Sequence, residues 1–497
     1  MEGHQLKKER VMEDNQDHIS LLPNSILSTI WSLLKIREAV GFSVLSTRWR
    51  YLWTTSLTNL TFDADNMLDK NDYSESETST YHIGELHRLI ISWKRKLSFI
   101  NSVNQFLLYL GDDLKIDKLK VYFTFRCNKY GSHLDDWIDF AFSRKVEEID
   151  LCLFEDTFFH VPDDGELYDF PCHLLDDYGG ERGLRSFMKC LRLAYCKLAP
   201  GRSNFLGFST LTSLDLNQVD LVSEKHIYTL LSNCAQLEWL SFCQCYNMDH
   251  LKINHPLCNQ LKYLSVKDCH ELEAIEFNGS NLEILEYKGF MIDFLFSNVQ
   301  RLKTVFSHAF ISRATNSVVC PLSTFRADLP QLETLILSCS SCSVEVLFTT
   351  FPTFSRLKHL SILDIPKCKH NLFRIATVLE ATPTLQILEL HLRAYEYVEE
   401  PKEITRTPSS SCLHDHLKKV VITGTHGCLS EIELAIYLLN SSQSLAKMVI
   451  DPRPRLYHGN GKWDILEACA TWNTVGRLNI YEHLAREVCS PVELLIL

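Results

Sequence analysis

Cysteines and histidines stand close together at three places in the sequence, and these residue types at short spacing could bind a metal ion or exchange a disulfide. The places are CQC (Cys243, Cys245), CSSC (Cys339, Cys342) and HPLC (His255, Cys258). Neither cysteine pair has a second CxxC or an H-x3-H at zinc-finger spacing, so no metal site is expected. HPLC is better interpreted as a loop.

Motifs of the common catalytic sites are missing from the sequence. It has no G-x-S-x-G elbow, no P-loop, no G-x-G-x-x-G and no H-E-x-x-H. Histidines and cysteines are plentiful, so a Cys/His pair can come close by chance, but a pair without an orienting third group is weak evidence for a nucleophile. We therefore expect a protein without an active site or cofactor of its own, and keep an enzyme as an alternative.

Composition narrows the class of protein further. The net charge of −12 argues against a general nucleic-acid binder, which needs a basic face. No apolar run approaches the roughly 18 residues of a membrane span, so no membrane partner is expected. The first residues show no apolar secretory segment, and the 18 cysteines are scattered along 497 residues. We expect mostly reduced thiols and a location in the nucleus or cytoplasm.

A repeated phrase of the form L-x-x-L-x-L occurs along most of the chain. Clear copies are LTSLDL at 211, LEWLSF at 237, LKYLSV at 261, LEILEY at 282, LETLIL at 332, LKHLSI at 357 and LQILEL at 385; weaker copies stand at 116, 146, 188 and 302. The spacing, mostly about 20 to 32 residues, brackets the leucine-rich-repeat period. Because no single repeat can bury its leucines alone, stacked short strands should form a parallel sheet along a solenoid. Unrelated strands with alternating leucines are the poorer alternative.

The repeat also predicts which side chains face a partner. Cys196, Cys245 and Cys269 follow their strands at the position where such repeats place a small buried side chain. Residues between the inward leucines should lie on the concave face of the solenoid. Five large side chains at these positions are candidate substrate-binding residues: Trp239, Tyr263, Ile284, Phe306 and Ile336. The alternative is that a loop or the carboxyl-terminal region covers them.

Three short amphipathic helices are expected near the amino end, and they bury too little surface to be stable alone. Their apolar positions should contact either a core or a partner. These positions are Leu22, Pro23, Ile26, Leu27, Ile30, Val40, Val44, Trp49, Leu52 and Trp53. The spacing of Trp49, Leu52 and Trp53 puts all three on one helix face. A small helical cap on the next domain is the alternative.

The segment DHISLLPNSILSTIWSLLKIREAVGFSVLSTRWRYLWTTSLTNLTFD, residues 17–63, resembles an F-box of the form found in plant F-box proteins with leucine-rich repeats. The Leu-Pro pair, the EAV helix start and SVLSTRWRYLW fall in the same order. Lys35 stands where these proteins usually have proline. The resemblance implies that the apolar positions above bind a Skp-type adaptor and, through it, a cullin ubiquitin ligase.

The segment CLHDHLKKVVITGTHGCLSEIELAIYLLNSSQSLAKMVIDP, residues 412–452, resembles the FBD motif of the same proteins. It predicts a strand (417–422), a helix (about 431–440) with Ser430 as N-cap, and a second strand (445–450). The expected fold is therefore α/β, with a three-helix F-box, a leucine-rich-repeat solenoid built on a parallel sheet, and an FBD-like unit closing it. The expected boundaries are 1–16 (disordered), 17–63 (F-box), 64–99 (linker and helical segment), 100–411 (solenoid) and 412–497 (FBD-like region).

Taken together, the resemblance implies a non-catalytic specificity subunit of a ubiquitin ligase that binds an unknown protein substrate. The alternative is a repeat-based scaffold that acts without ubiquitin transfer; adaptor binding and substrate turnover distinguish the two. Some F-box proteins with leucine-rich repeats hold an inositol phosphate in a basic pocket. The corresponding cations here are few (Arg192, Lys267 and Lys288), so we expect no such cofactor.

Overall fold

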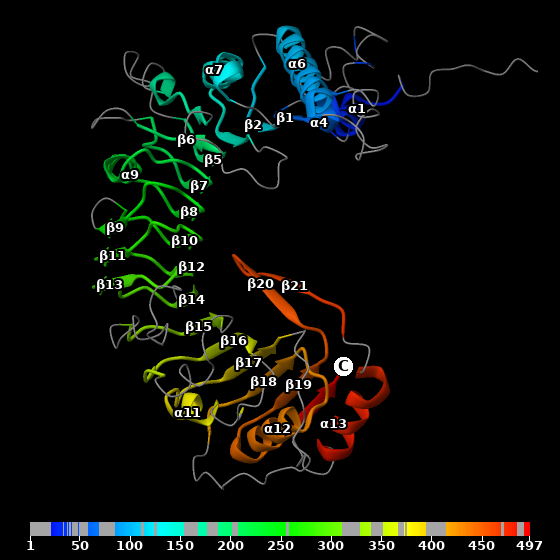
Figure 1. Cartoon of the computed structure of the whole chain (residues 1–497), viewed down its shortest axis with the longest axis vertical. Helices are drawn as coiled ribbons and strands as arrows, with labels where there is room; N and C mark the ends of the chain where they lie inside the picture. Colours follow the sequence, from blue (N-terminus) through cyan, green and yellow to red (C-terminus); the bar gives the residue numbers. More distant parts are fainter. Residues whose placement is uncertain are drawn as a thin grey trace, which may run out of the picture.

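The fold is a curved solenoid of parallel strands (Figure 1). The computed structural model describes residues 21–32, 34–36, 38, 41, 48, 58–68, 85–110, 114–123, 127–153, 167–175, 187–200, 207–254, 258–310, 329–338, 351–365, 372, 375–393, 414–468, 472–484 and 492–497. Within these residues, fifteen strands form one sheet, and neighbouring strands are parallel throughout. The predicted α/β solenoid with a large parallel sheet is confirmed.

The strands of this sheet follow the repeated phrase. In chain order they are β1 (Asn59–Asp63), β2 (Lys118–Tyr122), β3 (Glu148–Cys152), β5 (Cys190–Ala194), β7 (Ser213–Asn217), β8 (Trp239–Cys243), β10 (Tyr263–Lys267), β12 (Ile284–Phe290), β14 (Thr304–Phe310), β15 (Thr334–Ser338), β16 (His359–Ile365), β17 (Ile387–Leu392), β18 (Lys419–Thr423), β19 (Lys447–Asp451) and β22 (Glu493–Ile496).

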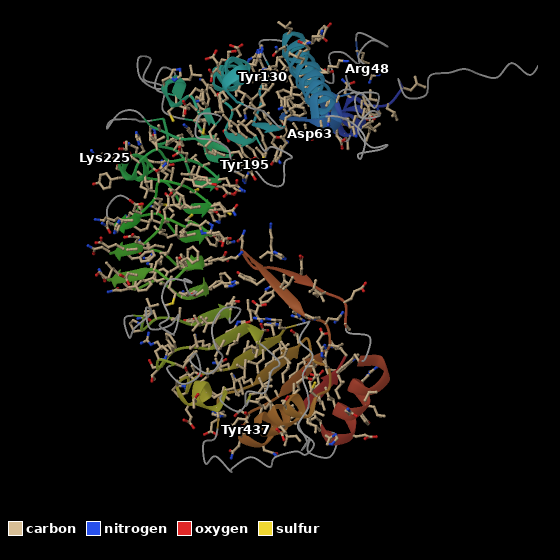
Figure 2. The ribbon with its side chains drawn as sticks, in the orientation of Figure 1. Arg48, Asp63, Tyr130, Tyr195, Lys225 and Tyr437 are labelled. Carbon is tan, nitrogen blue, oxygen red and sulfur yellow. The ribbon has the colours of Figure 1, made fainter. Side chains whose placement is uncertain are left out.

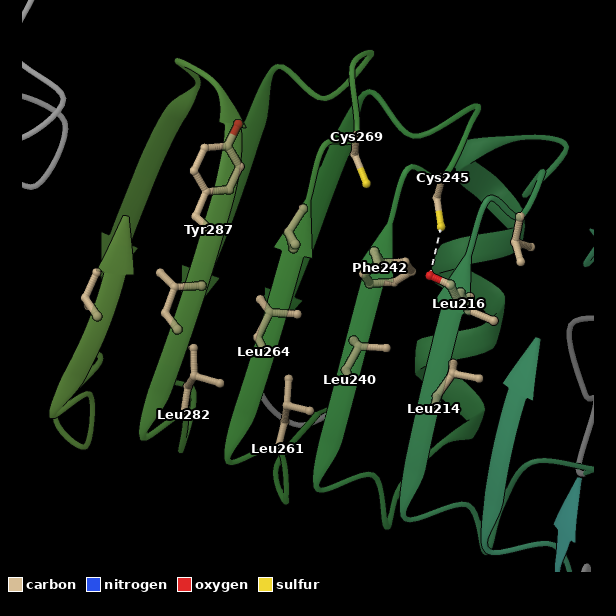
Figure 3. Packing of buried hydrophobic residues seen from close by; sticks show 14 of the residues in the cluster. Leu214, Leu216, Leu240, Phe242, Cys245, Leu261, Leu264, Cys269, Leu282 and Tyr287 are labelled. Carbon is tan, nitrogen blue, oxygen red and sulfur yellow. Dashed lines mark hydrogen bonds between the residues drawn. The ribbon is translucent and has the colours of Figure 1, made fainter. Parts of the chain in front are cut away.

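The leucines of the phrase explain why these segments form one sheet. Side chains alternate between the two faces of a strand, so the second and third leucine positions point the same way. In β8 these positions are Leu240 and Phe242, both fully buried. Leu240 is in register with Leu264 of β10, and the apolar positions therefore stack from rung to rung (Figure 3). The stacked residues form one continuous core along the solenoid.

Small elements cover the convex side of the sheet (Figure 1). Some rungs return through helices, which are α7 (Cys127–Ser143), α9 (Glu224–Asn233), α11 (Ile375–Glu380) and α12 (Leu429–Ser441). In the middle of the solenoid a second parallel sheet replaces them, made of β9 (His250–Asn254), β11 (Ala274–Asn278) and β13 (Asp293–Ser297). A short two-stranded pair joins β4 (Tyr168–Asp169) to β6 (Cys196–Lys197).

The amino-terminal end of the sheet is closed by helices α4 (Ala64–Met67) and α6 (Glu85–Tyr109), with α1 (Asn24–Ser32) nearby. Phe62 of β1 packs edge-on against Phe106 and Trp137, which come from α6 and α7. Strand β1 lies within the predicted F-box segment, but it pairs with β2 and so belongs to the same sheet as the repeats. The three-helix F-box and the domain boundaries stay predictions, because most residues between 33 and 57 lie outside the described part.

The carboxyl-terminal end contains the expected strand, helix and strand, namely β18, α12 and β19; its assignment as an FBD unit stays a prediction. The expected N-cap, Ser430, is wrong: the helix begins at Leu429 and Cys428 is its N-cap. The carboxylate of Glu431 accepts hydrogen bonds from the backbone N–H groups of His426, Gly427 and Cys428, and this fixes the earlier start. The π-helix Trp472–Gly476, α13 (Arg477–Leu484) and the edge strand β22 follow.

The cysteines after the strands have a structural role. Cys245 and Cys269 are buried in the turns that follow their rungs, and Cys196 is buried in the short strand β6. The thiol of Cys245 donates to the carbonyl oxygen of Leu216 on an adjacent rung, at 3.4 Å (Figure 3). Burial raises the pKa of Cys258 to about 12, so this thiol stays protonated and unreactive at neutral pH.

Candidate functional site

The concave face of the sheet carries the side chains that alternate with the core leucines. Three positions of each rung face this side, and in β8 they are Trp239, Ser241 and Cys243. Because the rungs are in register, each position forms a row along the solenoid. These rows hold the five predicted substrate-binding residues and many of the charged side chains of the sheet.

A β-hairpin from the carboxyl-terminal region crosses this face. It consists of β20 (Arg455–Gly459) and β21 (Lys462–Ile465), which pair with each other in antiparallel fashion. Asn460 and Gly461 form its turn with φ of 49° and 69°, the two positive values that a type I′ turn requires. Figure 1 shows the hairpin reaching from the carboxyl-terminal end toward the middle of the concave face. We call residues 455–465 the hairpin.

Polar contacts hold the hairpin tip on β10 and β12. Oε1 of Glu286 accepts hydrogen bonds from the hydroxyl group of Tyr457, at 2.7 Å, and from the backbone N–H of Asn460, at 2.6 Å. Nζ of Lys267 donates to the carbonyl oxygen of His458 at 3.1 Å and lies 3.4 Å from Oε2 of Glu286. Glu286 is only 2% exposed, so these donors compensate a buried carboxylate.

The backbone of the tip passes close to the charged ends of Lys267 and Glu286 at Gly459. A β-carbon added to Gly459 would lie 2.2 Å from Nζ of Lys267 and 2.5 Å from Oε2 of Glu286. At Gly461, by contrast, an added β-carbon would meet no atom within 4 Å. Gly459 therefore allows the backbone to approach the two charged side chains, while Gly461 serves the turn.

Aromatic rings of the hairpin cover the next rungs. Tyr457 packs on Phe306 with ring centroids 4.8 Å apart, and Trp463 lies beside Tyr457 at the same separation. Phe306, Ile336 and Leu363 form a separate apolar cluster that Tyr457 and Trp463 complete. Among the described residues, the apolar side chains that pack against this cluster from outside it are Tyr457 and Trp463, so the hairpin provides its cover.

The structure places the five predicted substrate-binding residues in one region, but not in one environment. Trp239 and Ile284 are partly exposed, whereas Tyr263 is nearly buried and its ring stacks on Trp239 with centroids 5.2 Å apart. Phe306 and Ile336 are 4% and 8% exposed beneath the hairpin, so the expectation of an open surface fails there. Alternation along a strand predicts the face of a side chain and not what covers it. Substrate binding by the five residues stays a prediction.

Electrostatics reinforce the hairpin contact. Burial, together with the charge of Glu286, raises the pKa of Tyr263 above the usual value of a phenol. Burial also raises the pKa of Tyr457; its bond from Gly461 opposes this shift and its bond to Glu286 adds to it. Both hydroxyl groups therefore stay protonated at neutral pH. Tyr457 can then donate to Glu286.

A second polar cluster lies near the base of the hairpin. Glu389 lies 3.3 Å from Nε2 of His359 and 3.8 Å from Nε2 of His391. Burial alone would raise the pKa of Glu389, but the two nearby histidines outweigh it and hold the pKa below its usual range. His391 also bonds Thr423 and faces the ring of Trp463, which anchors the hairpin's second strand.

The predicted cation positions are paired with carboxylates. Arg192 bonds Glu148 and lies 3.9 Å from Asp150, Lys267 pairs with Glu286, and Lys288 lies 3.2 Å from Asp268. These pairs leave the concave face without a cluster of unpaired cations at the three positions. The absence of an inositol phosphate cofactor stays a prediction.

The predicted adaptor-binding residues can be followed only in part. Ile26 and Ile30 of α1 are exposed, Pro23 is exposed, Leu22 is half-buried, and Leu27 points into the core at 1% exposure. Leu27 therefore supports α1 from inside rather than presenting an open contact. Val40, Val44, Trp49, Leu52 and Trp53 lie outside the described residues.

Arg48 ties two parts of the predicted F-box together. Its guanidinium group donates to the carbonyl oxygen of Leu22 and to the side chain of Asn24, each at 2.7 Å. These bonds fix the start of α1 next to the Leu-Pro pair. Figure 2 shows Arg48 near α1 at one end of the solenoid and Tyr437, on α12, at the other.

The candidate metal and redox pairs gain no support from the described residues. No group of three histidine, cysteine or acidic side chains in the described ranges is placed to hold a metal ion. Cys243 lies on the concave face and Cys245 is buried in the following turn, and Cys339, Cys342 and His255 lie outside the described part. Among the helices that the structure describes, none has the length and apolar character to cross a membrane.

Sequence reasoning missed the hairpin and its contacts with Lys267 and Glu286. A signal was present, since Asn460-Gly461 between Tyr457 and Trp463 is the dipeptide that favours type I′ hairpins. Nothing in the local sequence indicates that this hairpin returns to rungs nearly two hundred residues earlier.

The stacked L-x-x-L-x-L strands define a leucine-rich-repeat solenoid. A family model described as "At1g61320/AtMIF1, LRR domain" matches residues 109–497. The chain belongs to this family. The Arabidopsis thaliana F-box/FBD/LRR-repeat protein At1g13570 is 34% identical over 230 residues, which are 46% of this chain and 45% of that protein.

Two further Arabidopsis thaliana relatives align over most of the chain. F-box/FBD/LRR-repeat protein At3g26920 is 24% identical over 446 residues, covering 87% of this chain and 89% of that protein. FBD-associated F-box protein At1g66310 is 24% identical over 491 residues, covering 90% of this chain and 93% of that protein. The recognised resemblance to plant F-box, FBD and leucine-rich-repeat proteins is confirmed, and the comparisons indicate no enzyme family.

Proposed function

We propose that this chain is the substrate-recognition subunit of a Skp-cullin-F-box ubiquitin ligase. In this role the amino-terminal helices bind a Skp-type adaptor, and the concave face of the solenoid binds a protein substrate. The observation that carries the proposal is the joining, in one chain, of a leucine-rich-repeat sheet with an F-box-like segment whose α1 exposes Ile26 and Ile30. The names of the relatives support the same combination.

The chain needs no bond-making group of its own for this function. Holding a substrate near a ubiquitin-charged conjugating enzyme raises the effective concentration of the substrate's lysine side chains. The solenoid is suited to such a task because its rungs form one continuous core, which keeps the two binding ends at a fixed separation. We also propose that the protein acts in the nucleus or the cytoplasm.

Capture followed by mass spectrometry tests this function. Proteins bound to the intact chain and to a chain lacking residues 17–57 are compared in cells with the proteasome inhibited; the deletion stops before β1, which the solenoid needs. We expect the same substrate with both chains, and a Skp-type adaptor and ubiquitinated substrate only with the intact chain. Substrate capture without adaptor or ubiquitin by the intact chain would instead favour a repeat-based scaffold.

A further inference from the structure

The hairpin depends on the concave face for its structure. A two-stranded hairpin alone is marginally stable at best in water. Within the described residues, β20 and β21 pair only with each other. The hairpin therefore owes its order to the surface beneath it, which we call the seat and define as Lys267, Glu286, Phe306, Ile336 and Leu363.

The seat has the features of a site that recognises a peptide turn. Glu286 accepts one phenol hydroxyl and one backbone N–H, and Lys267 donates to one backbone carbonyl oxygen. The apolar members of the seat receive an aromatic ring beside these polar groups. Such a combination of fixed polar groups and an apolar floor is typical of peptide-binding sites.

The chain's own hairpin does not use the seat fully. Oε2 of Glu286 is buried and receives no hydrogen bond from the hairpin; it faces the ammonium group of Lys267 at 3.4 Å. A ligand that offered a second N–H or O–H group there would form one more charge-assisted bond than the hairpin does.

We propose that the seat is a binding site for a tyrosine-bearing turn of a protein partner, and that the hairpin occupies this site until the partner displaces it. The inference rests on the proposed role of the concave face in substrate recognition. Docking of the hairpin and binding of the partner exclude each other, because both need the Oε1 lone pairs of Glu286 and the apolar floor around Phe306. A partner therefore binds only if its affinity for the seat is high enough to displace the hairpin.

The test uses the hairpin sequence itself as the probe. A fluorescent peptide of residues 454–466, closed by a disulfide between added terminal cysteines, is titrated by anisotropy into three full-length chains. The first is unchanged. In the second, residues 456–464 are replaced by two glycines, which suffice because Arg455 and Ile465 are paired across the hairpin. The third adds Glu286→Gln and Lys267→Met to the second.

We expect saturable binding to the shortened chain, with an affinity at least tenfold higher than for the unchanged chain, whose seat is occupied. The third chain should bind the peptide at least tenfold more weakly than the second. Equal binding to all three, or no binding to a folded shortened chain, would overturn the proposal and leave the hairpin as a permanent strut. The experiment involves no adaptor or ubiquitin, so its failure does not bear on the proposed ligase function.

A matched pair of point variants keeps the proposal testable if the shortened chain does not fold. Gly459→Ala and Gly461→Ala both place a side chain at positive φ, but only the first would contact the seat. We expect Gly459→Ala to speed amide hydrogen exchange in residues 455–465 and to increase binding of the peptide at least fivefold over Gly461→Ala. Indistinguishable exchange and binding in the two variants would show that the hairpin is not displaceable.

Discussion

The hydroxyl group of Tyr457 offers the most local perturbation of the hairpin, and we predict that Tyr457→Phe loosens it without weakening the solenoid. The substitution removes one oxygen atom and keeps the ring that packs on Phe306. Oε1 of Glu286 then keeps only the N–H of Asn460 as a donor from the hairpin. The solenoid core is untouched, because Leu240 and its stacked neighbours lie on the other face of the sheet.

The expected loss of hairpin stability follows from the negative charge of Glu286, which accepts the hydrogen bond from Tyr457. A hydrogen bond to an ionised group contributes about 1.5–3 kcal/mol, more than the roughly 1 kcal/mol of a neutral one. Since about 1.4 kcal/mol is tenfold in an equilibrium constant, the open form of the hairpin should become about 10- to 100-fold more populated. Water reaching Glu286 in the open form solvates its carboxylate, which places the effect toward the lower part of that range.

Amide hydrogen exchange with mass spectrometry measures this population directly. Peptides that cover residues 455–465 should exchange faster in Tyr457→Phe by the factor above, while peptides from β7 and β8 should not change. Tyr481→Phe is the matched control, because Tyr481 is exposed on α13. Unchanged exchange in the hairpin would refute the role of this bond, and faster exchange everywhere would refute the independence of hairpin and core.

Other predictions concern the core, the concave face and pH. Leu240→Ala should lower the free energy of unfolding by about 2–5 kcal/mol in a denaturant titration, because its side chain is fully buried; the exposed Leu478→Ala is the control. Trp239→Ala should weaken substrate capture and leave the melting temperature nearly unchanged, whereas a comparable loss of stability would mean that Trp239 belongs to the core. Burial lowers the pKa of His414. The unfolded chain, with a histidine pKa of about 6.5, then binds a proton that the folded chain does not, and stability declines as pH falls from there through the folded pKa. His414→Gln should therefore lose less melting temperature than the unchanged chain between about pH 7.5 and about pH 5.5, and an equal loss would exclude His414 as a source.

Short-range patterns account for what the sequence predicted well. The strands β7, β8 and β10 begin within two residues of the start of the L-x-x-L-x-L copy that predicted them. Two inward-facing positions per rung fix both the strand and its register. Even the weak copy at 302, LKTVFS, forms β14, with Val305 buried and Ser307 taking the second inward position. Pairing with the neighbouring rungs therefore forms a strand even where the local leucine pattern is weak.

Long-range contacts account for what the sequence could not predict. Phe306 and Ile336 were placed on the correct face, but their burial depends on Tyr457 and Trp463, which come more than a hundred residues later. Glu286 looked like an ordinary polar residue between two inward apolar ones. Its role depends on the contact with the hairpin tip. Neither the repeat period nor a local motif in the sequence predicts that contact.

The measurement that most directly tests the account is the affinity of the purified chain for a Skp-type adaptor. Titration calorimetry compares the unchanged chain with Ile26→Asp and Ile30→Asp, which alter exposed positions of α1, and with Ser25→Ala as a neutral change on the same helix. Burying an isoleucine side chain contributes about 1.5–3 kcal/mol, so each aspartate should weaken binding by roughly tenfold or more while Ser25→Ala does not. Failure of the folded, unchanged chain to bind the adaptor, or equal binding by all variants, would contradict the assignment of this segment as an F-box.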